Sequence, residues 1–319
     1  MTPTRHHSPE VTFILLSFAR PRNLARIVES ILRAESRGRI IVCNNQPAID
    51  IRDYLDSGDD RLEIIQTDAV WGPIKRYHIA RERPGPFYVS IDDDIFLTPS
   101  QIDQLVNALI ADPSRAHGVW GQILQIDSGK FNLTSGVHNK NCAVSNLNCV
   151  YAFTKTHVRR YFELLEILGM SNLREIGPGD DIFLSFSGAQ EPLCHNFGPI
   201  EVCPSYNQAG VARFQSENFT TRRIRLYRRL QALSAPEMDA AVLEKTFTAL
   251  ANGAATSAFR RHLKNLNSII ATELGQSDST FISEGNLFYH HEITYPQDAA
   301  PDESRAYKRN NFIYALRGA

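Results

Sequence analysis

The sequence predicts an α/β fold, and three observations support this prediction. Apolar segments of strand length alternate with amphipathic segments of helix length from residue 11 to about residue 153. The longest apolar run, residues 11–19, is typical of a buried strand and is far shorter than the ~20 residues that cross a bilayer. Helix-start signals stand between the strands, above all Thr98 followed by Pro99. Together these features indicate a sheet covered by helices.

Each expected element follows from the spacing of its apolar residues. Strands are expected at residues 11–18, 39–43, 62–66, 87–91, 118–126 and 149–154. Helices are expected at residues 23–34, 74–81, from 99 onward, 157–168 and 182–186. Thr98 and Thr156 are the residues expected to cap the third and the fourth of these helices.

The composition excludes several classes of protein. The chain has 319 residues, of which 43% are hydrophobic and 22% charged, so it is neither a disordered chain nor a small disulfide scaffold. Acidic and basic residues nearly cancel, at 35 against 34, so no global charge attracts the protein to nucleic acid. The basic residues are 27 Arg and 7 Lys. This excess of arginine indicates either codon bias or repeated recognition of phosphates and carboxylates.

The cysteines and the N-terminus favour a cytoplasmic protein. Five cysteines, without metal-type spacing, are expected to be reduced thiols. A bridge between Cys194 and Cys203 would need an oxidising compartment. The first ten residues contain no apolar segment of a secretory signal.

The amino-acid composition of the chain changes after Pro204. Five arginines fall within residues 221–230, and residues 236–274 consist mostly of helix-forming residues, with glycine only at Gly253. We therefore expect an N-terminal arm at residues 1–10, a main domain at residues 11–230 and a mainly helical C-terminal extension at residues 231–319.

Three consecutive acids, Asp92, Asp93 and Asp94, follow the expected strand at residues 87–91. In open α/β sheets this end of a strand is where ligands bind. Adjacent carboxylates repel one another, and a hard divalent cation completed by substrate phosphates removes the repulsion. Asp92 and Asp94 fit a D-x-D arrangement, in which one acid ligates the metal and the other holds it through water or contacts a ribose. The alternative is an acidic turn before the helix capped by Thr98.

A second acidic pair, Asp180 and Asp181, stands where a Gly/Pro-rich loop enters a short apolar helix. One acid is enough to cap a helix, so the second is left for another task. Capping and catalysis are both open interpretations of the pair.

Four further polar residues are candidates for a nucleotide pocket. Arginine suits bidentate contact with phosphate, and asparagine can contact a base or a ribose. Each of these residues lies near a strand end or on a segment that leads to the acidic edge: Arg20, Asn44, Asn45 and Arg76. Individually they are also typical surface residues.

The segments that carry these residues resemble one known family, in the same order along the chain. Residues 12–24 are similar to the family's opening strand with its Thr-Tyr-Asn-Arg segment, and residues 39–45 to a strand ending in Trp-Asn-Asn. Residues 87–94 resemble a strand that closes on three Asp, and residues 179–186 resemble a Cys-Asp/Glu-Asp-Ile-Ala-Met-Asn-Phe segment. Over about residues 10–230 the chain resembles a GT-A glycosyltransferase, and it is most similar to the exostosin-like family.

This resemblance implies a GT-A fold, which is a Rossmann-like mixed sheet flanked by helices, and a D-x-D enzyme. It implies transfer of N-acetylhexosamine from a UDP-sugar, with retention, to a glycan or other hydroxyl acceptor, as in polysaccharide biosynthesis. The expected cofactor is Mn²⁺ or Mg²⁺. The implied roles are UDP contact for Arg20, Asn45 and Arg76; ribose and metal contact for Asp92, Asp93 and Asp94; and catalysis for Asp181, with Asp180 as a cap or a contact to the acceptor hydroxyl.

The chain departs from the family at several motif positions. Ala19 and Cys43 replace an Asn and a Trp. Gly179 replaces a Cys, so the family's disulfide cannot form there, in agreement with a cytoplasmic enzyme. The family's later arginine is matched only loosely, with Arg213 as the substitute.

The C-terminal third offers weaker signals. His291, which follows His290 in an aromatic segment, is either an added metal ligand or a structural residue. Residues 231–319 resemble nothing known and are expected to complete the acceptor site. Five arginines form either a solvated basic face or a peripheral contact with the inner face of a membrane: Arg222, Arg223, Arg225, Arg228 and Arg229.

Two other functions compete with glycosyl transfer. A sugar nucleotidyltransferase has a related sheet, but it carries a Gly-rich loop after its first strand, whereas residues 17–21 contain no glycine. A non-catalytic protein that binds sugars or nucleotides would not need both acidic sites.

Overall fold

The computed structural model of the chain describes residues 10–55, 58–127, 130–133, 136–168, 170, 179–206 and 219–233. The chain divides into two compact units. The first unit consists of Met1–Arg160 and Asp180–Phe219, and the second of Tyr161–Gly179 and Thr220–Ala319.

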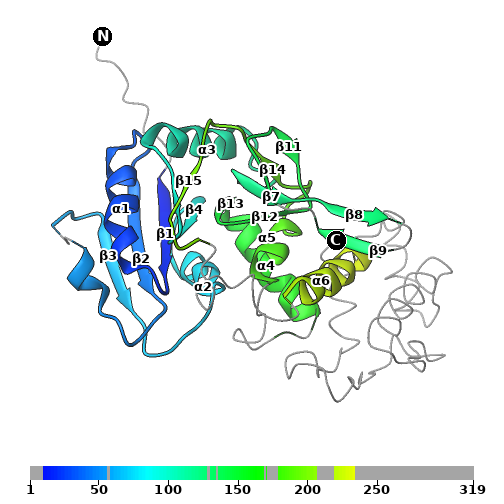
Figure 1. Ribbon diagram of the computed structural model, residues 1–319, viewed down its shortest axis with the longest axis horizontal. Coiled ribbons are helices and arrows are strands. Elements are labelled where there is room, and N and C mark those ends of the chain that lie inside the picture. Colours follow the sequence, from blue (N-terminus) through cyan, green and yellow to red (C-terminus); the bar gives the residue numbers. More distant parts are fainter. Residues whose placement is uncertain are drawn as a thin grey trace, which may run out of the picture. The chain divides into compact units, whose positions relative to one another are not determined.

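The first unit is built on a mixed eight-stranded sheet with the order β11-β14-β6-β13-β4-β1-β2-β3 (Figure 1). Four neighbouring strands are parallel: β1 (Val11–Ser17), β2 (Gly38–Asn44), β3 (Leu62–Gln66) and β4 (Phe87–Asp92). β13 (Val150–Thr154) runs antiparallel to β4. The sheet is extended by three two-residue strands: β6 (His117–Gly118), β14 (Leu193–Cys194) and β11 (Cys142–Ala143).

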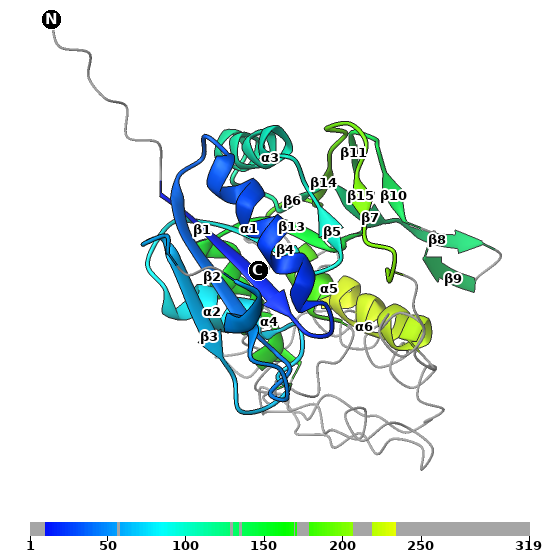
Figure 2. The same cartoon turned by 60° about the vertical axis from the view of Figure 1, so that its left-hand side comes forward.

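Helices cover both faces of this sheet. α1 (Leu24–Arg33), which follows the short helix η1 (Pro21–Asn23), and α3 (Pro99–Ala111) pack on one face, where Val89 and Ile91 join the main apolar core (Figure 2). α2 (Lys75–Glu82) packs on the other face, where Tyr77 and Tyr88 both contact Phe153. Residues 88 and 89 point to opposite faces because successive strand residues alternate. The predicted α/β fold, a mixed sheet flanked by helices, is therefore confirmed.

Small sheets and short helices complete the first unit. β5 (Ile95–Phe96) pairs with β15 (Glu201–Val202), and β7 (Trp120–Gln122) lies between β10 (Val137–His138) and β12 (Asn146–Leu147). β8 (Leu124–Asp127) pairs with β9 (Lys130–Leu133). The short helices are η2 (Ile51–Tyr54) and α5 (Asp180–Ser185).

The second unit contains the C-terminal part of α4 (Lys155–Ile167) and nearly all of α6 (Phe219–Leu233). Leu226, Tyr227 and Leu230 are buried residues of α6. A Cβ atom at Gly179 would lie 2.2 Å from Leu226 Cδ2, so a cysteine there would clash. No helix among the described residues is long and apolar enough to cross a membrane.

The structure corrects two expectations of detail and excludes one alternative. Residues 118–126 form parts of three short strands, β6, β7 and β8, instead of one. The fourth long helix begins at Lys155, which places Thr156 inside its first turn, so Thr156 does not cap it. Cys194 pairs in register with Cys142 across β14 and β11, and all five cysteines are free thiols, so there is no bridge from Cys194 to Cys203.

Some expectations lie outside the described residues. These include the N-terminal arm up to residue 9 and all of the C-terminal extension beyond residue 233. The expected domain boundary near residue 230 stays a prediction.

Candidate functional site

The candidate site lies at the edge of the sheet where the parallel strands end. β4 ends at Asp92, and a tight turn through Asp93 and Asp94 leads into β5. β13 runs in the opposite direction, so its first residues lie beside the last residues of β4. The Asp92 N–H accordingly donates a 2.9 Å hydrogen bond to the Cys149 carbonyl. The topology thus brings two distant segments to one point.

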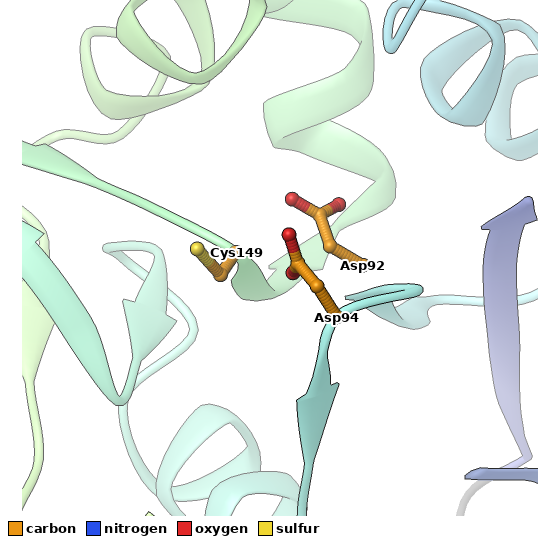
Figure 3. A group of neighbouring side chains, drawn as sticks. All are labelled: Asp92, Asp94 and Cys149. Atoms are coloured by element: carbon orange, nitrogen blue, oxygen red, sulfur yellow. The ribbon is translucent and has the colours of Figure 1, made fainter. Parts of the chain in front are cut away.

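Three side chains at this point offer ligands for a cation (Figure 3). One ligand atom each from Asp92, Asp94 and Cys149 lies within 4.8 Å of the other two. The sequence predicted the two aspartates as a pair. It did not predict Cys149.

Within the described part of the chain, Asp94 has an unpartnered buried oxygen and a strongly raised pKa. Its Oδ2 lies 3.2 Å from Arg20 Nη1, but its buried Oδ1 has no hydrogen-bond partner among the described residues. Burial, together with the charges of Asp92 and Asp93, raises the pKa of Asp94 to about 7. A divalent cation would supply the missing partner and relieve the repulsion between the carboxylates.

Asp92 is fixed by an arginine. Its side chain is 29% exposed, and its Oδ1 accepts a 2.7 Å hydrogen bond from Arg76 Nη2. Burial raises the pKa of Asp92, and so do the charges of Asp93 and Asp181, while the Arg76 guanidinium opposes this shift. Asp92 is therefore held in one orientation with part of its carboxylate accessible to a ligand.

Arg76 is buried, with 3% of its side chain exposed. Besides Asp92, it donates to the Pro73 carbonyl and the Ser90 hydroxyl, and its Nε lies 3.7 Å from Asp180 Oδ2. Burial acts to lower the pKa of Arg76, but negative charges, first of all that of Asp92, outweigh it and keep the guanidinium charged. Arg76 lies at the site as expected, but its N–H groups donate hydrogen bonds to the protein and not to a nucleotide.

Arg20 and Asp93 connect the ends of two strands. Arg20 Nη1 donates to Asp93 Oδ1 at 3.1 Å, and its other nitrogens donate to the hydroxyl and the carbonyl of Ser205. Asp93 Oδ2 accepts a 2.9 Å hydrogen bond from the Phe18 N–H, just after β1. Because both oxygens of Asp93 are bound to the protein, Asp93 is placed to hold the edge together rather than to bind a ligand.

The two asparagines at the end of β2 differ. Asn44 is fully buried, and its amide nitrogen donates to the carbonyls of Gln46 and Ile49, so both N–H groups serve the loop. Asn45 Oδ1 accepts from the Trp71 N–H at 2.7 Å, which leaves its Nδ2 without a hydrogen bond in the described part of the chain. Of the two, Asn45 is therefore the one equipped to contact a ligand.

The second acidic pair lies in the first turn of α5, and both residues are buried. Asp181 Oδ2 accepts a 2.9 Å hydrogen bond from Asn148 Nδ2, and its Oδ1 accepts from the Ile182 N–H at 2.9 Å. Asp180 lies beside Arg76. Since both acids lie inside the turn, neither precedes the helix as an N-cap residue does. Asn148 immediately precedes Cys149, so the second acidic pair is linked to the cation ligands.

Three residues of the site were not predicted from the sequence: Asn148, Cys149 and Ser205. The first two could have been found by pairing the expected strand at 149–154 antiparallel to the strand at 87–91, which brings residues 148 and 149 to the acidic edge. The sequence contains no comparable signal for Ser205, which is 185 residues from its partner Arg20.

Several other candidate residues are placed elsewhere or not described. His291 and Arg213 lie outside the described residues. On α6, Arg223 is buried while Arg222 and Arg225 are half-buried, so the expected basic face does not include Arg223. Association with a membrane stays a prediction.

Comparisons with known proteins identify no family: no family model matches the chain, and no curated relative matches it. Solved structures with some likeness include GalNAc-T7 with UDP, GalNAc and Mn²⁺, at 10% identity and a TM-score of 0.47, covering 83% of this chain and 58% of that one. A second is the mannosyltransferase PcManGT from Pyrobaculum calidifontis with GDP-Man and Mn²⁺, at 13% identity and a TM-score of 0.41, covering 86% and 77%.

A third is CMP:2-keto-3-deoxy-manno-octonic acid synthetase with CTP, at 10% identity and a TM-score of 0.36, covering 52% of this chain and 85% of that one. None of the three is described as exostosin-like, so that assignment stays a prediction. At these low TM-scores the likenesses carry no conclusion about activity.

Proposed function

We propose that the chain is a metal-dependent glycosyltransferase of the GT-A type, which transfers a sugar from a UDP-sugar to a hydroxyl acceptor. One observation carries the proposal. Two carboxylates, Asp92 and Asp94, meet at the ligand-binding edge of the sheet, and a buried oxygen of Asp94 has no partner among the described residues. The finer features, N-acetylhexosamine as the sugar and retention of configuration, come from the family resemblance alone.

The residues present fit a hard divalent cation. Carboxylate oxygens are the ligands that Mn²⁺ and Mg²⁺ prefer, and Asp92 and Asp94 supply them within reach of one another. When bound, such an ion neutralises charge on the departing diphosphate.

The surrounding residues prepare the carboxylates for this role. Arg76 keeps Asp92 in one orientation, and Arg20 positions Asp94 and Asp93 from the other side. Carboxylates held in fixed orientations by such contacts need little reorganisation when a nucleotide binds. The Nδ2 group of Asn45 is available to donate a hydrogen bond to the base or ribose.

Asp181 is the proposed residue at the reacting carbon. Glycosyl transfer passes through a transition state with positive charge on the sugar, which a nearby carboxylate stabilises or attacks. Asn148 holds the Asp181 carboxylate by a hydrogen bond of 2.9 Å. Asp180 is held beside Arg76 and is proposed to orient the turn that carries Asp181. The C-terminal extension is proposed to complete the acceptor site.

A panel of UDP-sugars, with release of UDP as the readout, tests this function. UDP release that requires Mn²⁺ or Mg²⁺, and that is lost in Asp94→Asn, is expected for at least one donor. A sugar nucleotidyltransferase would instead release pyrophosphate from CTP or UTP when given a sugar or sugar phosphate. Cation-dependent UDP binding without turnover of any donor, across a broad set of glycan acceptors, would indicate a binding protein and contradict the proposal.

A further inference from the structure

Cys149 lies at the cation site, yet the proposed transfer reaction does not need a thiol. Its φ angle is 63°, a left-handed conformation that non-glycine residues rarely adopt. Two backbone contacts hold it there: its N–H donates to the Tyr151 hydroxyl at 2.9 Å, and its carbonyl accepts from the Asp92 N–H at 2.9 Å. Such a conformation persists only where the surroundings enforce it.

This placement distinguishes Cys149 from the other four cysteines. Cys43, Cys194 and Cys203 are buried, and Cys142 is half-buried on β11 at the far end of the sheet. Cys149 is half-buried, and its sulfur lies within 4.8 Å of ligand oxygens of both Asp92 and Asp94 (Figure 3).

The spacing is suitable for one shared ion. Around one zinc ion, with about 2.3 Å to sulfur and about 2.1 Å to oxygen, three ligand atoms spread at about 120° lie about 3.6–3.8 Å apart. The three atoms, which lie within 4.8 Å of one another, therefore need to approach one another by about 1 Å. Asp94 Oδ2 faces Arg20, but the buried Asp94 Oδ1 has no hydrogen-bond partner in the described part of the chain, so one carboxylate oxygen is left for a further positive group.

We propose that Cys149 is a third protein ligand of the cation, and that this site binds thiophilic divalent cations such as Zn²⁺, Cd²⁺ and Co²⁺ more tightly than Mg²⁺. Thiolate ligands favour these ions, whereas two carboxylates alone favour Mg²⁺ or Mn²⁺. Binding replaces the thiol proton by the metal: the S–H bond breaks, a sulfur–metal bond forms and the proton passes to the solvent. The inference rests on the proposed function only in placing the cation at Asp92 and Asp94.

Cobalt reports directly on the sulfur, because a cobalt–thiolate bond gives a charge-transfer absorption in the near ultraviolet. Titration of the full chain with Co²⁺ is expected to produce this band in the wild type and in the matched control Cys142→Ser. The band is expected to be absent in Cys149→Ser. Calorimetry is expected to show Cd²⁺ binding at least ~10-fold weaker in Cys149→Ser, with Mg²⁺ binding changed less than ~3-fold.

A second measurement needs no substitution at Cys149, and so remains decisive if Cys149→Ser fails to fold. Cd²⁺ is expected to protect Cys149 of the wild type from alkylation, as read by peptide mapping, while Cys142 is labelled at an unchanged rate. The inference is overturned if Cys149 is accessible to the reagent and Cd²⁺ gives no protection, or if Cys149→Ser keeps the cobalt band. Co²⁺ binding that depends on Asp94 but lacks the band refutes the role of Cys149 alone. Co²⁺ binding that is unchanged in Asp94→Asn refutes the cation site of the proposed function as well.

Discussion

Arg76 Nη2 donates a 2.7 Å hydrogen bond to Asp92 Oδ1, and the same guanidinium lies 3.7 Å from Asp180 Oδ2. The buried Arg76 guanidinium thus connects an acid of the candidate metal site with the acidic pair on α5. Such a group is costly to remove, because the carboxylates that it neutralises stay in place without it.

We therefore expect Arg76→Met to lower the free energy of unfolding by about 3 kcal/mol, because it removes the guanidinium that neutralises Asp92 and Asp180. Urea unfolding at pH 7 measures the change. The exposed Arg81→Met on the same helix is the matched control and is expected to change the free energy by less than about 0.5 kcal/mol. Equal effects of the two substitutions would show that the network contributes no stability of its own.

The sequence was informative where local patterns decide the structure. The apolar run before Asp92 predicted a buried strand ending in acids, and Thr98 with Pro99 predicted a helix start, which has a full capping box with Gln101. It was less informative where distant segments meet. Gly118 and Gly121 approach the backbone of residues 150 and 146 so closely that a Cβ would clash, and these approaches belong to short strands where one long strand was expected.

The roles of the site residues were also hard to predict from the sequence where they depend on contacts between distant segments. A surface arginine and an arginine that neutralises a buried carboxylate are the same residue type in a sequence, so Arg20 and Arg76 were both predicted as nucleotide contacts. Only the fold shows that Arg76 is held by Asp92 and that Arg20 is held by Ser205. Cys149 was missed because its conformation and neighbours arise from the antiparallel pairing of β13 with β4.

Stability is expected to fall as the pH drops from about 6.5 to about 4. His117 Nε2 is hydrogen-bonded to the Asp112 carbonyl and is therefore a donor, which leaves Nδ1 to accept from His195 Nε2 at 2.8 Å. Burial lowers the pKa of His195 from 6.5 to about 4, and burial lowers the pKa of His157 to about 4 as well. Through these two histidines, the unfolded chain binds more protons than the native protein between these two pH values, so their contribution makes acid favour unfolding, whereas the raised pKa of Asp94 acts in the opposite direction.

His195→Gln tests this contribution, because glutamine can still donate to His117 but does not titrate. Denaturant unfolding at a series of pH values is expected to give a smaller loss of stability between pH 6.5 and pH 4 in the variant than in the wild type. Parallel curves for the two proteins would contradict the assignment.

Asp94→Asn is expected to abolish the cation dependence of UDP binding and to weaken UDP by about 1–3 kcal/mol, as for the loss of a charge-assisted contact. Calorimetry with UDP, with and without Mn²⁺, measures both effects. Asp93→Asn is the matched control, because both oxygens of Asp93 already bind the protein. It is expected to reduce stability while keeping the cation dependence. A wild-type response to Mn²⁺ in Asp94→Asn would exclude the proposed ligand.

Thr154, not Thr156, is expected to stabilise the start of α4. Thr154 Oγ1 accepts from the His157 N–H at 3.3 Å, and the Thr154 N–H donates to His157 Nδ1 at 3.0 Å, which is the reciprocal pattern of a capping box. Thr154→Ala should therefore lower the free energy of unfolding by about 1 kcal/mol. The exposed Thr156→Ala should change it by less than about 0.5 kcal/mol. Denaturant unfolding of both variants measures these changes. A larger loss of stability in Thr156→Ala than in Thr154→Ala would show that Thr156 caps the helix.

Asp181→Asn is the sharpest test of the catalytic assignment, because the structure allows it to preserve the fold. The new amide can accept from the Ile182 N–H, and the Asn148 amide can turn so that its Oδ1, which has no partner among the described residues, accepts from the new N–H group. Stability and UDP affinity should therefore change little. If the Asp181 carboxylate acts on the reacting sugar, kcat should fall by at least ~10²-fold with KM for the donor nearly unchanged.

Asp181→Ala separates this role from a structural one. It removes the hydrogen bonds to Asn148 and to the Ile182 N–H, so it should cost about 1 kcal/mol of stability, whichever role the carboxylate has. A purely structural carboxylate would therefore give normal turnover in Asp181→Asn and a destabilised protein in Asp181→Ala. A catalytic carboxylate gives the loss of turnover in both variants, because neither can place a negative charge beside the sugar. Near-normal kcat in Asp181→Asn, measured with a competent acceptor, would therefore assign the chemistry to another residue.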